Sequence, residues 1–205
     1  GVLVSATKGH AKIKAIDADA VKAMPGVIDV ITDYDTFIRN SQQGGETSAP
    51  TQGVRTVDYF GEIIAIVVAE SFEIARDAAK RLKVKYEPLD GTFDYEANKD
   101  EAEPAPDGLI KGHYDQGDFD KAFDNAAVKV DVTYTTPSQN SAAMEPHASI
   151  AVCEDGALTL YGAYQMPTSD AQQHAKALGV AQSKVRIISR YIGGGFGSKL
   201  GIAPE

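Results

Sequence analysis

The almost continuous apolar run from Glu62 to Ala69 restricts the fold of this chain more than any other feature. Its length fits one strand buried on both faces, and it is too short to cross a bilayer. After Ser71, apolar residues recur at helical spacing, and Lys83 to Tyr86 then alternates like a half-exposed strand. The sequence therefore predicts a strand–helix–strand unit of α+β type. The expected contacts of the helix with the strand are Phe72, Ala75, Ala79 and Leu82.

Shorter elements are expected before this unit. The chain opens directly on the apolar segment Val2 to Val4, so we expect it to begin within a longer polypeptide. Residues 33–57 are polar, rich in Gly, Ser and Gln, and without periodicity, which predicts a long surface loop. The other expected elements are a strand at Ile13–Ile16, a helix capped by Asp17 or Asp19 that runs through Met24 to a stop at Pro25-Gly26, and a strand at Val27–Ile31.

The middle of the chain has the composition of a connector. Residues 90–117 are rich in proline, acidic residues and glycine, which predicts an extended segment. Asp118 to Ala126 predicts one short helix with Phe119 and Phe123 on one side. Lys129 to Thr135 alternates strictly between apolar and polar residues, which predicts a strand.

A hairpin, a helix and a strand are expected in the last third of the chain. The hairpin turn is Glu154-Asp155-Gly156, and the helix starts at a capping box of Ser169 and Gln172. Gly179 stops this helix. The expected bounds are Ala148–Val152 and Leu158–Tyr161 for the hairpin strands, Leu178 for the helix end, and Val185–Ser189 for the final strand.

The composition is that of a globular protein of one or two domains. The chain has 205 residues, of which 43% are hydrophobic, and a formal net charge of −9. An acidic chain repels phosphate backbones, so we expect no nucleic-acid partner. No apolar run approaches the ~20 residues of a membrane span, so no membrane partner is expected either.

Cysteine and histidine usage argues against a protein-held metal cluster. Cys153 is the only cysteine, so the chain alone cannot hold an iron–sulfur cluster, and we expect Cys153 to be a small buried residue of its strand. The four histidines show no zinc-ligand spacing.

The strongest local motif is Gly193-Gly194-Gly195-Phe196-Gly197-Ser198-Lys199. Consecutive glycines let the backbone approach a ligand closely, and their amides can cradle anionic or oxo groups. The spacing fits neither a Walker phosphate loop nor a dinucleotide fingerprint. Taken alone, the segment is either a ligand-binding loop or a flexible glycine turn.

Two further segments are candidates for chemistry. Gln165 follows an expected strand end and precedes a helix, at the rim of a sheet, where its amide can bind a ligand or serve as an ordinary loop residue. Glu145 and His147 flank Pro146 and point to the same side of an extended chain. They form either an acid–base pair or a structural ion pair.

In order along the chain, these segments resemble the molybdopterin-binding subunit of the xanthine dehydrogenase and aldehyde oxidase family. The resemblance covers nearly the whole chain, and its first part is similar to the α/β-hammerhead domain of that family. The motifs that carry it are Gly9-His10-Ala11-Lys12-Ile13, Met24-Pro25-Gly26-Val27, Gly61–Glu70, Met144-Glu145-Pro146-His147, Tyr164-Gln165-Met166-Pro167, Ala177-Leu178-Gly179-Val180, Val185-Arg186 and Gly193–Lys199.

The resemblance implies a role for particular residues. Gln165 matches the glutamine that approaches the oxo ligand on molybdenum, and Gly194, Gly195, Phe196 and Gly197 match the loop that packs against the metal centre and its pterin dithiolene. The family hydroxylates aldehydes or N-heterocycles with oxygen from water, and the electrons pass to iron–sulfur clusters and often to FAD. The implied cofactor is molybdenum–molybdopterin, in bacteria as the cytosine dinucleotide.

The chain departs from the family pattern in several places. Ser198 stands where glycine is common, which resembles a bacterial aldehyde-oxidoreductase branch, Ser141 stands near the place of a frequent histidine, and Tyr164 replaces a threonine before Gln165. The catalytic glutamate of the family lies further along such subunits, so no residue here is assigned as catalytic base, and we expect the isolated chain to bind no cofactor and to be inactive.

The sequence thus predicts an α+β chain in three parts. Residues 1–90 are the hammerhead domain, 91–127 a connector, and 128–205 a partial sheet-and-helix unit at the start of the molybdenum-cofactor-binding domain. The expected function is part of a molybdenum hydroxylase in the cytoplasm, or else in the periplasm. Its expected partners are the remainder of the molybdenum subunit, iron–sulfur and FAD subunits, and an aldehyde or heterocycle substrate. The alternative is a non-catalytic binding or scaffolding domain derived from such an enzyme.

Overall fold

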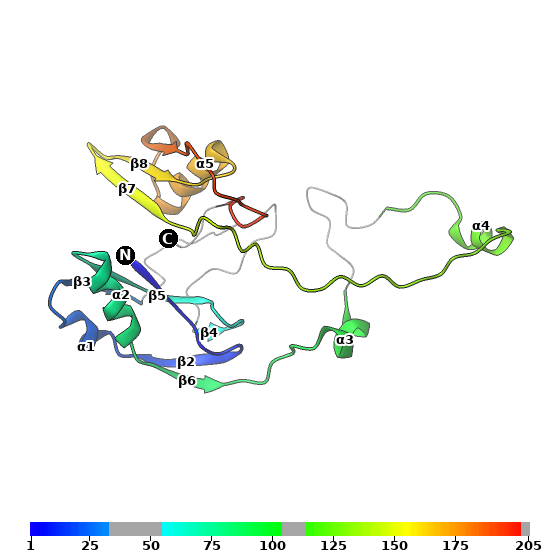
Figure 1. Cartoon of the computed structure of the whole chain (residues 1–205), viewed down its shortest axis with the longest axis horizontal. Coiled ribbons are helices and arrows are strands. Elements are labelled where there is room, and N and C mark those ends of the chain that lie inside the picture. Colours follow the sequence, from blue (N-terminus) through cyan, green and yellow to red (C-terminus); the bar gives the residue numbers. More distant parts are fainter. Residues whose placement is uncertain (33–54, 104–113, 202–205) are drawn as a thin grey trace.

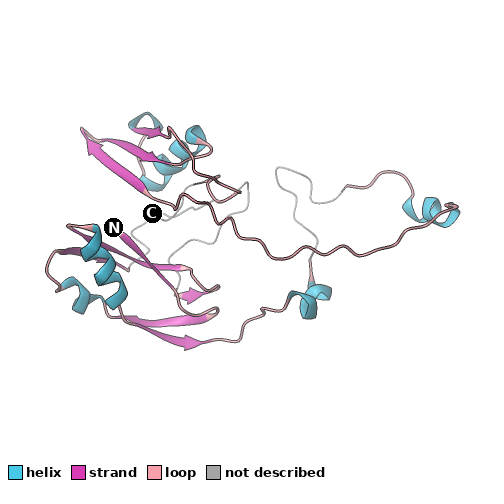
Figure 2. Ribbon diagram, in the orientation of Figure 1, coloured by secondary structure: helices cyan, strands magenta, loops and turns pink. Residues whose placement is uncertain are grey.

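The structure is a computed structural model, and it describes residues 1–32, 55–103 and 114–201. The described chain forms two folded units, with a long arm extending from them that carries two short helices (Figure 1). Within the described residues, the first unit has two three-stranded sheets and the second unit has one (Figure 2). No helix in these ranges is both long enough and apolar enough to span a membrane.

The apolar run forms β5 (Ile63–Ala69), the central strand of the order β1-β5-β3, as predicted. β1 (Val2–Ser5) and β3 (Val27–Ile31) pair with it antiparallel. Alternate β5 residues enter two cores: Ala65 and Val67 pack under the helices, and Ile64 packs on the opposite side. This double burial accounts for the absence of polar residues from the strand.

The helix after β5 is α2 (Phe72–Arg81), and Ser71 caps it by accepting a hydrogen bond from the Ile74 amide at 3.3 Å. Ala75, Ala78 and Leu82 are buried, whereas Phe72 is 59% exposed and packs against the Arg76 guanidinium, 5.4 Å from the ring centroid. The prediction that Phe72 faces the strand is therefore wrong. Phe72 is the first residue of the helix, where the chain has not yet turned its apolar face to the sheet.

The second sheet of this unit has the order β4-β2-β6. β2 (Ala11–Ile16) and β6 (Val84–Pro88) confirm the predicted strands, but β4 (Thr56–Val57) lies where a loop was predicted. Most of that predicted loop, residues 33–54, lies outside the described residues. The short helix α1 (Ala18–Lys22) follows Asp17, which holds the cap position without a side-chain hydrogen bond.

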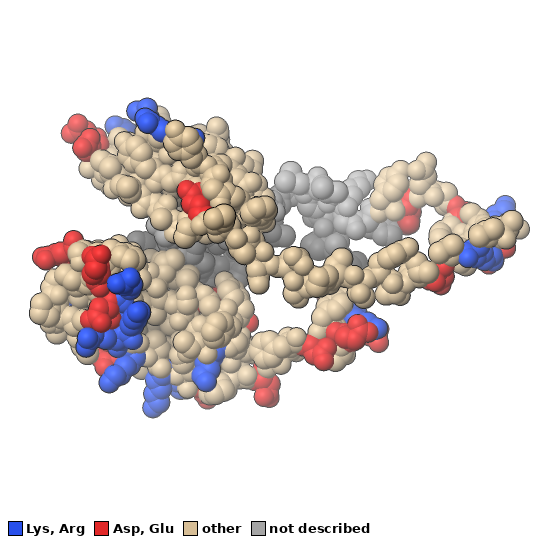
Figure 3. All heavy atoms as spheres, viewed as in Figure 1, with Lys and Arg blue, Asp and Glu red and all other residues tan. Residues whose placement is uncertain are grey.

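The predicted extended connector, residues 90–117, contains two short helical elements, and residues 104–113 of it lie outside the described residues. The arm contains α3 (Tyr95–Asn98), the 3-10 turn η1 (Lys99–Glu101) and the predicted helix α4 (Phe119–Asn125). The predicted strand Lys129–Thr135 is not formed, because no strand in the described part of the chain lies beside it. This segment is extended and exposed. Residues 132–143 contain no Lys, Arg, Asp or Glu, and this part of the arm is tan in Figure 3.

The second unit is the sheet β7-β8-β9 with helix α5 packed on it. β7 (Ser149–Glu154) and β8 (Ala157–Gly162) form the predicted hairpin, with Asp155 and Gly156 at positive φ. α5 (Pro167–Leu178) leads to β9 (Val185–Ile188), which runs parallel to β8. Gly179 ends α5 in the left-handed conformation, as predicted.

Two predictions for this unit are wrong. α5 begins at Pro167, so Ser169 is inside the first turn and its hydroxyl accepts from the Gln173 side chain instead of forming a capping box. Proline suits the first helical position because its missing N–H needs no partner there. Cys153 is exposed, because β7 is an edge strand and α5 covers the sheet at β8 and β9.

Candidate functional site

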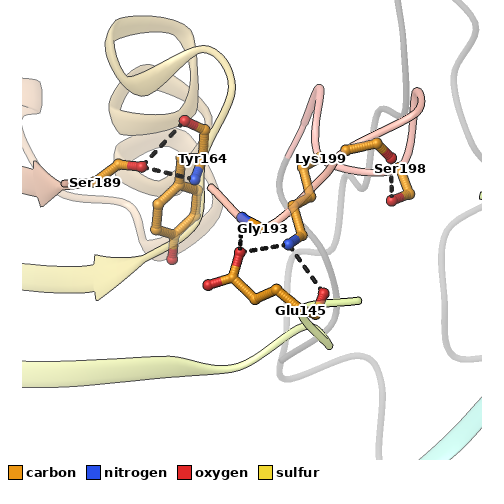
Figure 4. A network of polar contacts seen from close by, with 7 residues as sticks. Glu145, Tyr164, Ser189, Gly193, Ser198 and Lys199 are labelled. Carbon is orange, nitrogen blue, oxygen red and sulfur yellow. Dashed lines mark hydrogen bonds and ion pairs between the residues drawn. The ribbon is translucent and has the colours of Figure 1, made fainter. Parts of the chain in front are cut away.

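Three segments that are distant in sequence meet at one edge of the β7-β8-β9 sheet (Figure 4). Tyr164-Gln165 follows β8 and Gly193–Lys199 follows β9. Since β8 and β9 are parallel, the segments after them emerge at the same edge, the usual binding edge of such sheets. Glu145, ahead of β7, bonds to the glycine-rich loop. The structure thus brings together the three segments that the sequence singled out.

The main chain around Gln165 is held from two sides. Ser189 accepts a hydrogen bond from the Tyr164 N–H at 3.0 Å and donates one to the Tyr164 carbonyl at 3.2 Å. The Gln165 N–H donates to the Lys199 carbonyl at 3.0 Å. Gln165 is an exposed residue, and its side chain extends from a backbone that these hydrogen bonds hold in place.

Gly195 lets the Gln165 side chain pack directly against the main chain of the loop. A Cβ at position 195 would stand 2.3 Å from the Gln165 Oε1 atom, a distance that no real contact allows. Gly195 is also buried, in contrast to its neighbours Phe196 and Gly197. The glycine therefore serves close packing inside the site, which the sequence motif alone did not reveal.

Tyr164 fixes the position of the Tyr164-Gln165 segment through contacts with β7 and α5. Its ring is buried, its hydroxyl shares a hydrogen bond of 3.0 Å with Ser149, and its edge meets the His174 ring at 5.9 Å between centroids. Gly162 leaves room for this ring, since a Cβ there would lie 2.7 Å from it. Sequence reasoning missed Ser149, Ser189 and His174, because no local pattern signals contacts between residues so far apart.

The glycine-rich loop has a specific conformation. Gly194, Phe196 and Gly197 have φ values of 95°, 49° and 89°, and a left-handed φ is strained for phenylalanine. Ser198 holds the turn, with its N–H and hydroxyl both donating to the Gly195 carbonyl at 2.9 and 2.7 Å. The Ser141 hydroxyl donates to the Phe196 carbonyl at 3.1 Å, and the Phe196 residue is 76% exposed.

Glu145 belongs to a structural ion pair, but its partner is Lys199. The Lys199 Nζ atom lies 2.9 Å from the Glu145 Oε2 atom, and the Gly193 N–H donates to the same oxygen at 2.6 Å. These two donors hold the pKa of Glu145 below its usual value, and His147 adds a smaller effect in the same direction. A carboxylate whose pKa is lowered by two hydrogen-bond donors is a weakened proton acceptor, which favours the structural role of Glu145 over an acid–base role.

The contacts that the site offers suit a cofactor with oxo or anionic groups. The amide N–H groups of Gly194, Phe196 and Gly197 meet no hydrogen-bond acceptor among the described residues, and Gly197 has open space where a Cβ would be. Together with the exposed Gln165 amide, they can act as donors. In the described ranges, no three His, Cys, Asp or Glu side chains are grouped to hold a metal ion.

Comparison with known families accounts for both units. Residues 1–90 match the aldehyde oxidase and xanthine dehydrogenase a/b hammerhead domain, and residues 102–205 match the molybdopterin cofactor-binding domain. The chain belongs to the aldehyde oxidase and xanthine dehydrogenase family. The predicted fold class is confirmed: an α+β chain with a hammerhead domain followed by the start of the molybdenum-cofactor-binding domain.

Members of this family from bacteria resemble the chain over almost its full length. The aldehyde oxidoreductase molybdenum-binding subunit PaoC of Escherichia coli K12 is 40% identical over 98% of the chain, which spans 27% of that subunit. The nicotinate dehydrogenase large molybdopterin subunit of Eubacterium barkeri is 31% identical over 97% of the chain and 48% of its own length.

Solved structures of the family share the fold. Quinoline 2-oxidoreductase from Pseudomonas putida 86 superposes with a TM-score of 0.77 at 26% identity, covering 97% of this chain and 27% of that one. Carbon monoxide dehydrogenase from Oligotropha carboxidovorans gives the same TM-score at 28% identity, covering 97% and 28%. This chain therefore corresponds to about a quarter of these family members.

Proposed function

We propose that this chain is part of a molybdenum-dependent hydroxylase that oxidises an aldehyde or an N-heterocycle with water as the oxygen source. The observation that carries the proposal is the meeting of an exposed Gln165 amide with the glycine-rich loop at one sheet edge. Its relatives include an aldehyde oxidoreductase, a nicotinate dehydrogenase and a quinoline oxidoreductase, which span both substrate classes.

The proposed cofactor is molybdenum–molybdopterin in its cytosine dinucleotide form. When bound, it would accept two electrons from the substrate and supply the oxygen-transfer chemistry. Gln165 would donate a hydrogen bond to an oxo group, and Gly194, Gly195 and Gly197 would let the main chain approach the cofactor closely. The exposed Phe196 ring would cover the cofactor and exclude water from it.

We further propose that this chain supplies only part of the active site of a larger enzyme. Residues 1–90, 91–127 and 128–205 would serve as hammerhead domain, connector and first part of the cofactor domain. The remainder of the molybdenum subunit would supply the catalytic glutamate and most pterin contacts, and iron–sulfur and FAD subunits would take up the electrons. We place this enzyme in the cytoplasm, with the periplasm as the alternative.

The proposal is tested on the full-length subunit purified with its partner subunits. Molybdenum and cytosine nucleotide are measured after gel filtration, and turnover is measured with a panel of aldehydes and N-heterocycles in ¹⁸O-labelled water. We expect bound molybdenum, turnover of one of the two classes, and ¹⁸O in the product. A subunit without molybdenum would instead support a non-catalytic scaffolding domain, and unlabelled product would refute water as the oxygen source.

A further inference from the structure

Glu145 forms hydrogen bonds with both ends of the glycine-rich loop, Gly193 and Lys199. The Gly193 N–H donates to the Glu145 carboxylate at 2.6 Å, and the Glu145 N–H donates to the Gly193 carbonyl at 3.2 Å. At the other end of the loop, the Lys199 Nζ atom donates to the Glu145 carboxylate at 2.9 Å and to its carbonyl at 3.1 Å. The two ends are therefore tied to the same point, as Figure 4 shows.

The same lysine also bonds to the segment of Gln165. Its carbonyl accepts the Gln165 N–H at 3.0 Å, while its ammonium group reaches Glu145. Between the two ends of the loop lies Gly195, the residue against which the Gln165 side chain packs. A displacement of Lys199 would therefore change both the backbone anchor and the packing surface of Gln165.

The charge of this pair matters because Lys199 is buried. Its side chain is only 1% exposed, whereas that of Glu145 is 39% exposed. A buried ammonium group needs a charged or strongly polar partner, so without the carboxylate the lysine side chain would leave its place. Because the Glu145 side chain is partly exposed, water solvates its carboxylate, which lowers the free-energy cost of placing a charge there.

We infer that Glu145 and Lys199 are positioning residues, which set the conformation of the Gly193–Lys199 loop and through it the place of the Gln165 amide. This inference rests on the proposed function and adds to it the device that aligns Gln165. Neither residue needs to touch substrate or cofactor for this role.

The test uses Glu145→Gln and Lys199→Arg in the full-length subunit with its partner subunits. Glutamine keeps an acceptor for the Gly193 N–H but removes the charge, and arginine keeps the charge but changes the geometry. The matched control is the Glu87–Lys14 pair of the first unit, at 2.7 Å with both side chains about half exposed, changed as Glu87→Gln. Molybdenum content, kcat, KM, thermal unfolding and the electron paramagnetic resonance spectrum of reduced molybdenum are measured for each.

In molecules that hold molybdenum, we expect Glu145→Gln to lower kcat on the order of 10²-fold, as small misplacements at a reacting centre do. KM should change by less than about twofold, since no substrate contact is removed. The resonance spectrum should shift, Lys199→Arg should retain more activity than Glu145→Gln, and Glu87→Gln should match the wild type.

Three outcomes would overturn the inference. Wild-type turnover, KM and spectrum in Glu145→Gln would show that the pair does not position Gln165. Loss of assembly in both site variants would mark the pair as structural only. A wild-type complex without molybdenum would overturn the proposed function and this inference with it. Failure of the proposed function is thus seen in the wild type, whereas failure of this inference alone is seen only in the variants.

Discussion

At the scale of the residue, Gly195 and Gln165 form one unit of packing. The glycine-rich motif indicated backbone freedom, and three of its residues do have positive φ. Gly195 is different, because its role is to leave space for the Gln165 amide. Such a contact joins residues 30 positions apart, so only the fold reveals it.

Gly195→Ala should reduce activity far more than stability in the full-length enzyme. The new Cβ would stand 2.3 Å from the Gln165 Oε1 atom, and this flexible, exposed side chain can swing away. We expect the unfolding free energy to fall by less than about 1 kcal/mol, while turnover falls about as far as in Gln165→Ala. Adding Gly195→Ala to Gln165→Ala should then have little further effect on turnover, and independent losses from the two changes would show that they do not act through one contact.

Asp170, in the first turn of α5, should make the stability of the chain depend on pH. It is fully buried, and burial raises its pKa from 3.8 to about 6 against a smaller lowering effect of the Met166 backbone N–H. Between these values the folded state keeps a proton that the unfolded state has lost. The free energy of unfolding therefore falls as pH rises from about 4 to 6, by at most about 3 kcal/mol.

Asp170→Asn should remove this slope. Urea unfolding of the 205-residue chain at pH 3.5 to 7.5, followed by circular dichroism, would compare the variant with the wild type. The difference between them isolates Asp170, because Glu62, Glu145 and the other acids titrate equally in both. We expect the variant to gain stability relative to wild type above pH 4, and parallel pH curves would contradict the assignment.

At the scale of the element, periodicity predicted which segments become helices and strands. β5, α2, α4, the β7–β8 hairpin and β9 all follow from local pattern and turn chemistry. The errors concern what lies beside an element: Phe72 faces solvent, Cys153 lies on an uncovered edge strand, and Lys129–Thr135 has no neighbouring strand in the described part of the chain. Neighbours distant in sequence decide these features, so a local pattern does not contain them.

The packing of α2 on β5 can be tested by two substitutions with opposite expectations. Phe72→Ala should cost less than about 1 kcal/mol, because the ring is mostly exposed, whereas Ala78→Leu should cost about 1–3 kcal/mol by overfilling a buried contact. Chemical unfolding of the chain measures both. A larger loss for Phe72→Ala than for Ala78→Leu would return Phe72 to the buried face that its sequence spacing predicted.

At the scale of the molecule, the candidate site is open. Phe196, Met144 and Gln165 are all exposed, and Val128 to Tyr134 presents an alternating apolar pattern on a segment that pairs with no strand among the described residues. Cofactor sites usually enclose most of the ligand with contacts from several segments. The Escherichia coli and Pseudomonas putida subunits are about four times as long as this chain, and we propose that the additional residues enclose the cofactor and pair with this segment.

The isolated 205-residue chain should therefore bind no molybdenum cofactor. Its loop and Gln165 supply one side of a site, and its exposed apolar segment should favour self-association. Metal analysis and light scattering after gel filtration measure both properties. Molybdenum that co-elutes in stoichiometric amount with the purified chain would show that these residues are sufficient for binding.

The most direct test of the central claim is the effect of Gln165→Ala on the full-length enzyme with a confirmed substrate. An exposed side chain on an anchored backbone contributes little to folding, whereas losing one preorganised donor at a reacting centre costs about 10²–10³ in rate. We predict an unchanged melting temperature, unchanged molybdenum content, and a turnover lower by that factor. Turnover equal to that of the wild type would contradict the account and leave Gln165 as an ordinary loop residue.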